Sequence, residues 1–364
     1  MDVNAASAKV RTSAVNTSTV SVSAPAVSVS APGKVNLFLA LGAARPDGYH
    51  PLNTIFAQIG LTETVTVTAL QAPVMTASQP ASAASVPAAH AGSVPAAAQP
   101  VSAASAVPAQ PDPAPVAQST PRIELALTRP DSNVPLDSTN LAYRAAQAVA
   151  QQAAQRGLAT PDVRILLDKA VPVAGGMAGG SADAAATLKA CNEFWQVGLS
   201  LEELAQLGAQ LGADVPFGLY GGVALGTGRG DLIEPLKAAP GPYHWTFALQ
   251  HKGLSTAAVF KHFDATVQAP PEADMPPEQL LAALEVGDVA QVSRHIRNDL
   301  QATAIELRPE LGQLIDLAER AGALAAMVSG SGPTVAALSA SRAVAERVAL
   351  CWRTSPFCDQ VVTG

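Results

Sequence analysis

The sequence predicts an α+β protein of two lobes. Short runs in which apolar and polar residues alternate, at 64–68 and 123–127, are typical of half-buried strands. Longer runs with apolar residues at helical spacing, bounded by Ser, Thr and Gly, are typical of helices. The chain has 364 residues, and at about 100–200 residues per domain this length favours two domains.

Two segments differ from the rest in composition. Residues 1–30 are rich in Ser, Ala, Val and Thr, and residues 71–121 are largely Ala, Pro, Ser, Val and Gln. Proline removes backbone donors, and Ala and Ser bury too little apolar area to offset the entropy of ordering. We therefore expect a disordered extension over 1–30, with ordered structure from Ala31, and a disordered insertion over 71–121. Strand-like runs flank the insertion, so we expect a hairpin whose loop it enlarges.

The remaining elements follow from capping residues and apolar spacing. An Ala-rich helix is expected over 141–155, with Ser138 and Thr139 as candidate caps. Ser200 and Glu203 form a capping box that opens a second helix, which Gly212 ends. Further helices are predicted over 184–195, 276–284, 289–300 and 309–321, and further strands over 163–167, 325–328 and 334–338. We expect the two lobes to comprise residues 31–240 and 241–364.

Composition excludes several classes of partner. The chain carries 22 Lys and Arg against 29 Asp and Glu, a net charge of −7 with no basic stripe, which argues against nucleic acid. It contains no apolar run of about 18 residues, so we expect no membrane span. Cys191, Cys351 and Cys358 lack the spacing of a zinc site, so we expect no protein metal centre and a cytoplasmic location. We expect no obligate protein partner.

A glycine-rich segment at 172–183 predicts a phosphate-binding loop. A strand-like run precedes it and a helical run follows it, so backbone N–H groups and a helix N-terminus would face an anion. Ser181 adds a hydroxyl that suits a phosphate or magnesium. The segment matches neither the Walker nor the Rossmann pattern. A tight strand–turn–helix connection without a ligand is the structural alternative.

Three other segments contain residues that suit catalysis or binding. Lys34 and Asn36 share one face of an expected strand, whose alternative is a solvated surface. Asp214 lies between a helix end and a proline, which suits a fixed general base or a simple helix cap. Tyr49 and His50 leave a Pro-Asp-Gly turn side by side, as a base-binding pair or as an ordinary exposed turn. A Ser-Gly-Ser-Gly turn at 329–332 would form a hairpin or support the phosphate loop.

Taken in order, these segments resemble the GHMP kinases. Residues 31–39, 172–183 and 329–335 correspond to the three motifs of that superfamily. Residues 45–50, 168–172 and 212–216 are similar to the branch whose substrate carries a cytidine diphosphate. The resemblance covers residues 31–70 and 123–338, and neither the extension nor the insertion has a counterpart in it.

The resemblance implies a fold and an activity. It implies an ATP-binding N-terminal lobe, a C-terminal substrate lobe and an active-site cleft between them. It also implies ATP-dependent phosphorylation of the 2-hydroxyl of 4-diphosphocytidyl-2-C-methyl-D-erythritol, in the non-mevalonate route to isoprenoid precursors, with Mg²⁺ as cofactor.

The resemblance also implies residue roles. Asp214 would be the base and Lys34 its partner, Asn36 would contact the substrate, and Tyr49, His50 and Phe260 would hold the cytosine. Asn140 and Lys169 would frame the adenine. The phosphates of ATP would bind the residues of the loop, which are Pro172, Val173, Ala174, Gly175, Gly176, Met177, Ala178, Gly179, Gly180, Ser181 and Ala182.

Two other functions stay open at this point. A GHMP kinase of the mevalonate or homoserine type would have no use for the Tyr49–His50 pair. A non-catalytic ligand-binding regulator on the same fold would need neither Lys34 nor Asp214. Alanines replace several glycines of related loops, Ala178 among them, and each restricts the backbone dihedral φ, so the loop conformation is in question.

Overall fold

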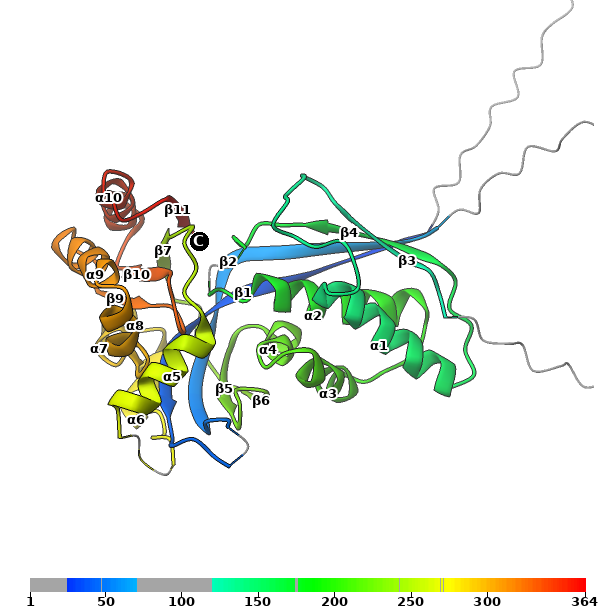
Figure 1. Ribbon diagram of the computed structural model, residues 1–364, viewed down its shortest axis with the longest axis horizontal. Helices are drawn as coiled ribbons and strands as arrows, with labels where there is room; N and C mark the ends of the chain where they lie inside the picture. Colours follow the sequence, from blue (N-terminus) through cyan, green and yellow to red (C-terminus); the bar gives the residue numbers. More distant parts are fainter. Residues whose placement is uncertain are drawn as a thin grey trace, which may run out of the picture.

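The computed structural model describes residues 25–46, 48–70, 120–173, 176–241, 243–268, 270 and 272–364. Two β-sheets with helices against them form the described part, which confirms the α+β fold (Figure 1). The expected insertion lies outside the described residues except for 120 and 121, as do residues 1–24 of the expected extension. Within the described part, every helix is too short or too polar to span a bilayer.

A seven-stranded sheet forms the first layer. Its main path runs β3 (Ile123–Leu127), β4 (Val163–Asp168), β2 (Leu52–Ala69), β1 (Ala26–Leu41) and β8 (Arg297–Asn298). A branch adds β5 (Val223–Thr227) beside β2, and then β6 (Leu232–Pro235). Strands β1 and β2 are long and pass from one half of the molecule into the other (Figure 1).

Strand β1 begins earlier than the sequence predicted. Residues 26–30, which we expected in the disordered extension, pair in register with the end of β2. Val27 and Val29 pack against the core, while the hydroxyl of Ser28 lies 2.7 Å from that of Thr66. The alternating Val and Ser residues therefore form a strand because a partner strand covers them, which low complexity alone did not reveal.

The predicted hairpin around the insertion is wrong. Strands β2 and β3 do not pair with each other, because β4 lies between them, antiparallel to β2 and parallel to β3. The sequence shows where each strand lies but carries no signal for a third strand that arrives 36 residues after β3 ends.

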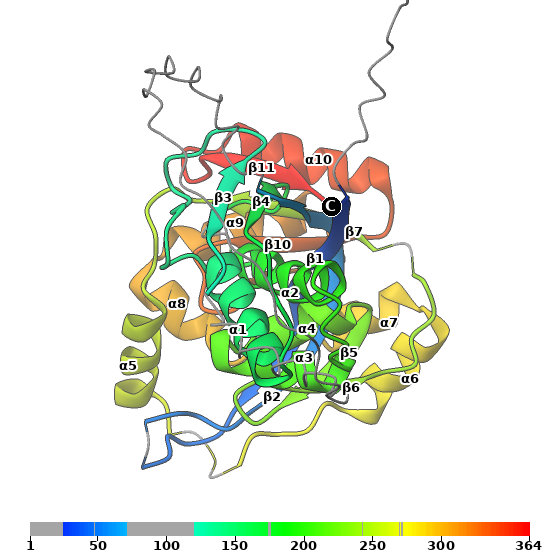
Figure 2. The ribbon, with the colours of Figure 1, turned by 90° about the vertical axis from the view of Figure 1, so that its right-hand side faces the viewer.

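Four helices accompany this sheet. Helices α1 (Leu141–Gln155) and α2 (Gly179–Phe194) lie along one face, with α3 (Leu201–Leu211) and α4 (Val215–Tyr220) beyond them (Figures 1 and 2). Many facing residues of α1 and α2 are buried alanines, which let helix and sheet approach closely. The capping box of α3 and its end at Gly212 are confirmed. The cap of α1 is Asn140, not Ser138 or Thr139, because the Asn140 side chain accepts the Ala142 N–H.

A second, four-stranded sheet has the order β11 (Gln360–Thr363), β7 (His244–Leu249), β10 (Val335–Ser339) and β9 (Ala325–Val328). The helices of this half are α5 (Thr256–Thr266), α6 (Glu278–Val286), α7 (Val289–Arg294), α8 (Gln301–Leu307), α9 (Glu310–Arg320) and α10 (Arg342–Arg353). The single helix expected over 289–300 is wrong. It is α7 followed by β8, because residues 297–298 pair with β1.

One apolar core joins the two sheets. Leu37 and Ile55 of the first sheet belong to the same buried cluster as Phe247 and Leu338 of the second. Residue 240, the expected lobe boundary, lies between β6 and β7. Strand β8 follows this residue in the sequence and still joins the first sheet, so the sheets do not divide at residue 240 alone. The boundary therefore stays a prediction.

Close packing of α4 on α2 generates a prediction about stability. A Cβ atom added at Gly218 would lie 2.8 Å from the Cβ of Ala185, so one helix would have to move. We expect Gly218→Ala to lower the free energy of unfolding by about 1–3 kcal/mol, the usual cost of overpacking, despite alanine's helix propensity. Gly253→Ala is the matched control, because a Cβ there meets nothing within 4 Å. Urea unfolding of both variants measures this, and equal stabilities would contradict it.

Candidate active site

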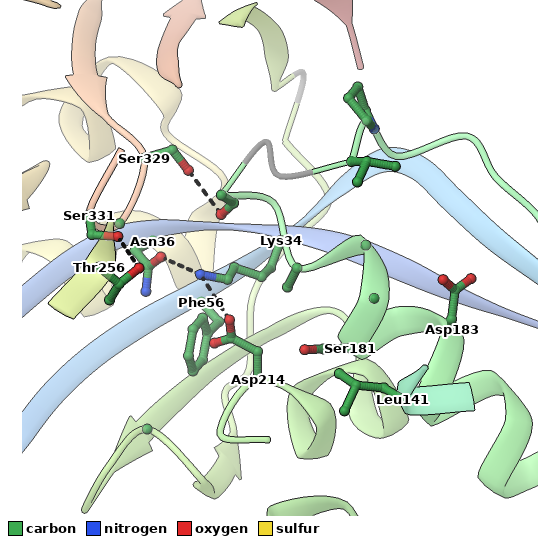
Figure 3. Close-up of a pocket in the computed structure, with 18 of the residues that line it drawn as sticks. Lys34, Asn36, Phe56, Leu141, Ser181, Asp183, Asp214, Thr256, Ser329 and Ser331 are labelled. Atoms are coloured by element: carbon green, nitrogen blue, oxygen red, sulfur yellow. Dashed lines mark hydrogen bonds and ion pairs between the residues drawn. The ribbon is translucent and has the colours of Figure 1, made fainter. Parts of the chain in front are cut away.

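A cavity of about 570 Å³ lies where the two halves meet. Its walls come from β1, β2, the segment before α2, the residue before α4, helix α5 and the turn at 329–331 (Figure 3). The volume falls within the range of about 300–1,000 Å³ that is typical of small-molecule sites. Lys34, Asn36, Asp214, Asn140, Lys169 and Phe260, which the sequence singled out, all line it.

Lys34 and Asn36 belong to a buried chain of hydrogen bonds. The ammonium of Lys34 donates to Asn36 Oδ1 at 2.8 Å, and Asn36 Nδ2 donates to the Thr54 hydroxyl at 2.8 Å. Thr54 in turn donates to the Phe38 carbonyl at 2.6 Å. Each polar atom in this chain has a defined partner, so the two side chains on the cavity face of β1 are held in one orientation. The alternative of a solvated strand face is excluded, because Lys34 is only 6% exposed.

Asp214 faces this chain from the opposite wall. It occupies the N-cap position of α4, yet its side chain makes no capping hydrogen bond. Its Oδ2 atom instead lies 3.5 Å from the Lys34 ammonium, which also lies 5.4 Å from the centre of the Phe56 ring (Figure 3). The carboxylate is 35% exposed, so it remains accessible from the cavity. These contacts favour the catalytic interpretation over the helix cap.

The predicted phosphate loop leads directly into α2. Ala174 and Gly175 lie outside the described residues, but Pro172, Val173 and the residues from Gly176 onward are described. The Lys34 N–H donates to the Met177 carbonyl at 3.0 Å, which attaches the loop to β1. Helix α2 begins at Gly179, five residues before the predicted start, so Gly179, Gly180 and Ser181 form its first turn. The Ser181 hydroxyl lies on the side facing Asp214 (Figure 3).

Ala178 has a left-handed backbone at the start of α2. Its φ is 58°, where an L-residue with a Cβ is strained and glycine is favoured. The loop thus adopts a left-handed turn at this position although the residue is alanine and not glycine. Met177 is fully buried, and this anchors the turn in the core that joins the sheets.

The turn at 329–332 supports the loop. The Ser329 hydroxyl donates to the Gly176 carbonyl at 3.3 Å (Figure 3). Gly176 has a φ of 64°, and a Cβ there would lie 3.0 Å from the Ser329 carbonyl oxygen. Asn298 fixes the turn from behind by donating to the carbonyls of Val328 and Gly330, each at 2.8 Å. The second half of the chain thus braces a loop that belongs to the first.

Lys169 lies between two carboxylates. Its ammonium is 2.6 Å from Glu63 Oε1 and 2.5 Å from Asp183 Oδ2. Burial raises the pKa of Asp183 to about 7 against the lowering effect of Lys169, and burial likewise raises the pKa of Glu63. Burial lowers the pKa of Lys169, but the two carboxylates outweigh it and the net direction is upward. Lys169, Glu63 and Asp183 therefore form a buried ion cluster at the wall of the cavity, where the sequence led us to expect the adenine.

Asn140 is occupied as a helix cap. Its Oδ1 atom accepts from the Ala142 N–H at 2.8 Å, and its Nδ2 group donates to the Pro135 carbonyl at 2.6 Å. The residue is 8% exposed and lines the cavity, so it fixes the wall where α1 begins.

The three expected base-binding residues are near one another but differently placed. The His50 ring lies 5.2 Å from the Phe260 ring, and Phe260 lines the cavity. His50 itself is 7% exposed, with Nδ1 at 2.8 Å from the Gly42 carbonyl and Nε2 at 3.0 Å from Asp264 Oδ1. Tyr49 is 55% exposed beneath the guanidinium of Arg229. The structure thus engages both His50 ring nitrogens within the protein, where the sequence predicted a side chain directed at a base.

Several site residues escaped sequence reasoning. Glu63 and Thr54 hold the side chains of Lys169 and Asn36, and Asn298 holds the backbone of the turn at 329–332; each contact arises through the tertiary fold. A single polar residue within a strand, as at Thr54 and Glu63, is a weak signal that alternation alone would assign to a solvated face. Their burial at 0% exposure reveals the role.

Comparison with protein families gives two matches. Residues 140–222 match the model of the GHMP kinases N terminal domain, and residues 280–356 match that of the GHMP kinases C terminal domain. The first match spans Asn140, the phosphate loop and Asp214.

Individual proteins resemble the chain over nearly its full length. A protein of Streptomyces coelicolor named 4-diphosphocytidyl-2-C-methyl-D-erythritol kinase is 41% identical over 338 residues, which are 92% of this chain and 94% of the relative. A protein of Rhodococcus jostii with the same name is 42% identical over 319 residues, covering 87% and 85%.

Solved structures agree in fold. A crystal structure of 4-(cytidine 5'-diphospho)-2C-methyl-D-erythritol kinase matches with a TM-score of 0.64 and 26% identity, covering 93% of this chain and 98% of the other. A homoserine kinase from Cytophaga hutchinsonii matches with a TM-score of 0.60 at 16% identity, covering 93% of each chain, which shows the fold alone. With these relatives, the chain belongs to the 4-diphosphocytidyl-2-C-methyl-D-erythritol kinase family of the GHMP kinases.

Proposed function

We propose that the protein uses this cavity to phosphorylate the 2-hydroxyl of 4-diphosphocytidyl-2-C-methyl-D-erythritol with ATP. It would thereby act as a kinase of the non-mevalonate route to isoprenoid precursors. The names of relatives more than 40% identical over most of the chain support this substrate. The observation that carries the chemistry is the Lys34–Asp214 pair, 3.5 Å apart, in the same cavity as the phosphate loop. We propose the cytoplasm as its location, which agrees with three free cysteines.

Asp214 is positioned to act as the general base. Its half-buried carboxylate, accessible from the cavity, accepts the proton of the 2-hydroxyl while that oxygen forms a bond to the γ-phosphorus of ATP, and the bond to the β–γ bridging oxygen breaks. Lys34 places a positive charge beside the hydroxyl, where negative charge develops during transfer. Asn36 holds the ammonium through a 2.8 Å hydrogen bond, so little reorganisation is needed.

The first turn of α2 is suited to the phosphates. A helix of 16 residues offers unpaired N–H groups and a positive dipole end at Gly179 and Gly180. For Mg²⁺, the Ser181 hydroxyl supplies an oxygen on the cavity side, and oxygen ligands beside phosphate suit this ion. When bound there, the ion would neutralise charge on the phosphates.

We assign the cytosine to the end of the cavity at Phe260, whose ring lies 5.2 Å from that of His50, although neither Tyr49 nor His50 lines the cavity. Phe260 supplies an aromatic surface, and the exposed ring of Tyr49 supplies a second. The His50 ring joins Gly42 to helix α5 through Asp264, so it fixes the turn that carries Tyr49 relative to Phe260. Mevalonate and homoserine contain no nucleobase, so a kinase acting on either would have no use for these aromatic rings.

An ADP-release assay tests the proposed activity. We expect turnover with ATP, Mg²⁺ and 4-diphosphocytidyl-2-C-methyl-D-erythritol, and none with uncytidylated methylerythritol phosphate, mevalonate or homoserine, which lack the cytosine. Turnover with one of those three compounds instead would overturn the substrate. Bound ATP without turnover on any of them would favour a non-catalytic regulator.

Substitution of Asp214 tests the base. We expect Asp214→Asn to lower kcat by about 10²–10⁴-fold, the usual contribution of a general base, with ATP affinity nearly unchanged. Asp288→Asn is the matched control, since Asp288 is also an N-cap aspartate, at α7, and does not line the cavity. Steady-state kinetics and ATP titration give both quantities, and an unaltered kcat in the Asp214 variant would remove it from this role.

Substitution of His50 tests the base end of the cavity. We expect His50→Ala to raise KM for the cytidyl substrate by about tenfold, which corresponds to about 1.4 kcal/mol, with KM for ATP unchanged. The reason is that the turn carrying Tyr49 loses its attachment to α5. His262→Ala is the control, because His262 is on α5 but pairs with Glu306 away from the cavity. An equal rise in both KM values would refute this assignment.

A further inference from the structure

The ion cluster of Glu63, Lys169 and Asp183 lies behind the phosphate loop. Asp183 points away from Lys34 and Asp214, so the cluster is separate from the catalytic pair (Figure 3). Its side chains are 0%, 14% and 3% exposed, for Glu63, Lys169 and Asp183 respectively. Lys169 and Asp183 line the cavity, whereas Glu63 is not among its lining residues.

Glu63 holds one end of the loop and lies close to the other. Its Oε2 atom accepts the Ala170 N–H at 3.0 Å, where the chain leaves β4 toward the loop. Its Oε1 atom accepts from Lys169 and fills the space beneath α2, since a Cβ at Gly179 would lie 2.9 Å from it. Glu63 itself is on β2, within the paired region of the sheet. One carboxylate therefore holds the start of the loop through Ala170 and leaves no room for a side chain at the first residue of α2.

Asp183 extends this arrangement to the cavity. Lys169 holds its Oδ2 atom, while its Oδ1 atom, although buried, has no hydrogen-bond partner among the described residues. A buried carboxylate oxygen without a donor is costly, so a bound group that can donate is favoured there. In ATP the groups that can donate to this oxygen are the adenine amino group and the ribose hydroxyls, whereas phosphate oxygens accept.

Stability alone is a weak reason for such a cluster. Buried ion pairs often contribute no more than apolar residues of similar volume, whereas removal of one partner is costly. The cluster instead orients its side chains and the adjoining backbone, because each hydrogen bond fixes the position of one atom relative to the sheet.

We propose that Glu63 is a positioning residue for ATP, acting through Lys169 and the Ala170 amide on the phosphate loop and on Asp183. The inference rests on the proposed function in that it takes the nucleotide to bind in this cavity. Glu63 itself does not touch the substrate.

Glu63→Gln tests the proposal while preserving side-chain size. We expect ATP affinity, measured by calorimetric titration, to fall about tenfold, KM for ATP to rise to match, and KM for the cytidyl substrate to stay within about twofold. Glu124→Gln is the control, because Glu124 is also a sheet residue paired with basic side chains, but its partners are Arg122 and Arg164 rather than Lys169 and the Ala170 amide. A rise in both KM values alike, with a lower unfolding temperature, would show a general structural role and overturn the proposal.

A double-substitution cycle tests the route through Lys169. If Glu63 acts in part through Lys169, then Glu63→Gln and Lys169→Met together weaken ATP binding by less than the sum of the two single losses. Fully additive losses would overturn this route.

The titration separates this proposal from the proposed function. Unchanged ATP affinity in Glu63→Gln, together with normal turnover of the cytidyl substrate by the unsubstituted protein, overturns only the role of Glu63. Lack of that turnover, together with a tenfold loss of ATP affinity in the variant, overturns only the substrate and supports the role of Glu63.

Discussion

The contacts of Lys34 are the constraint on which the site depends. Its backbone N–H binds the phosphate loop at Met177, and its ammonium lies between Asn36 and Asp214. One residue of β1 therefore contacts both the loop that we propose to bind phosphate and Asp214, the proposed base. The preceding Gly33 permits this approach, since a Cβ there would lie within 3.1 Å of Ile59, Val171 and the Met177 carbonyl. In-line phosphoryl transfer depends on such positioning more than on covalent chemistry.

A buried ammonium group is costly unless hydrogen-bond partners or an opposite charge compensate for its loss of water. Asn36 and Thr54 supply a chain of uncharged hydrogen bonds that ends at a backbone carbonyl, so Asp214 is the one carboxylate paired with Lys34 within the described residues. The loop at 172–183, in contrast, is supported from two sides. Glu63 holds its start from the first sheet, and Ser329 holds Gly176 from beside the second. Both halves of the chain must therefore be folded together before the loop reaches its final geometry.

The sequence predicted those elements whose signals are local. Helix 141–155, the capping box at Ser200 and strand 325–328 agree with the structure, because spacing and caps act within a few residues. Errors occurred where a distant strand decided the outcome. Residues 26–30 became a strand through β2, the expected hairpin was separated by β4, and the helix over 289–300 was ended by pairing with β1. Pairing partners far along the chain leave no local pattern.

The same division holds for the site. The sequence by itself determined the loop at 172–183, Lys34 and Asp214, because these chemical groups occur in ordered motifs with fixed local spacing. Only the tertiary structure decided that Asp214 faces Lys34 rather than capping α4, and that both His50 ring nitrogens are engaged. It alone identified Glu63 as the support of the loop. The physical reason is that hydrogen bonds and ion pairs across the fold depend on burial and direction, which arise only when distant strands and helices pack together.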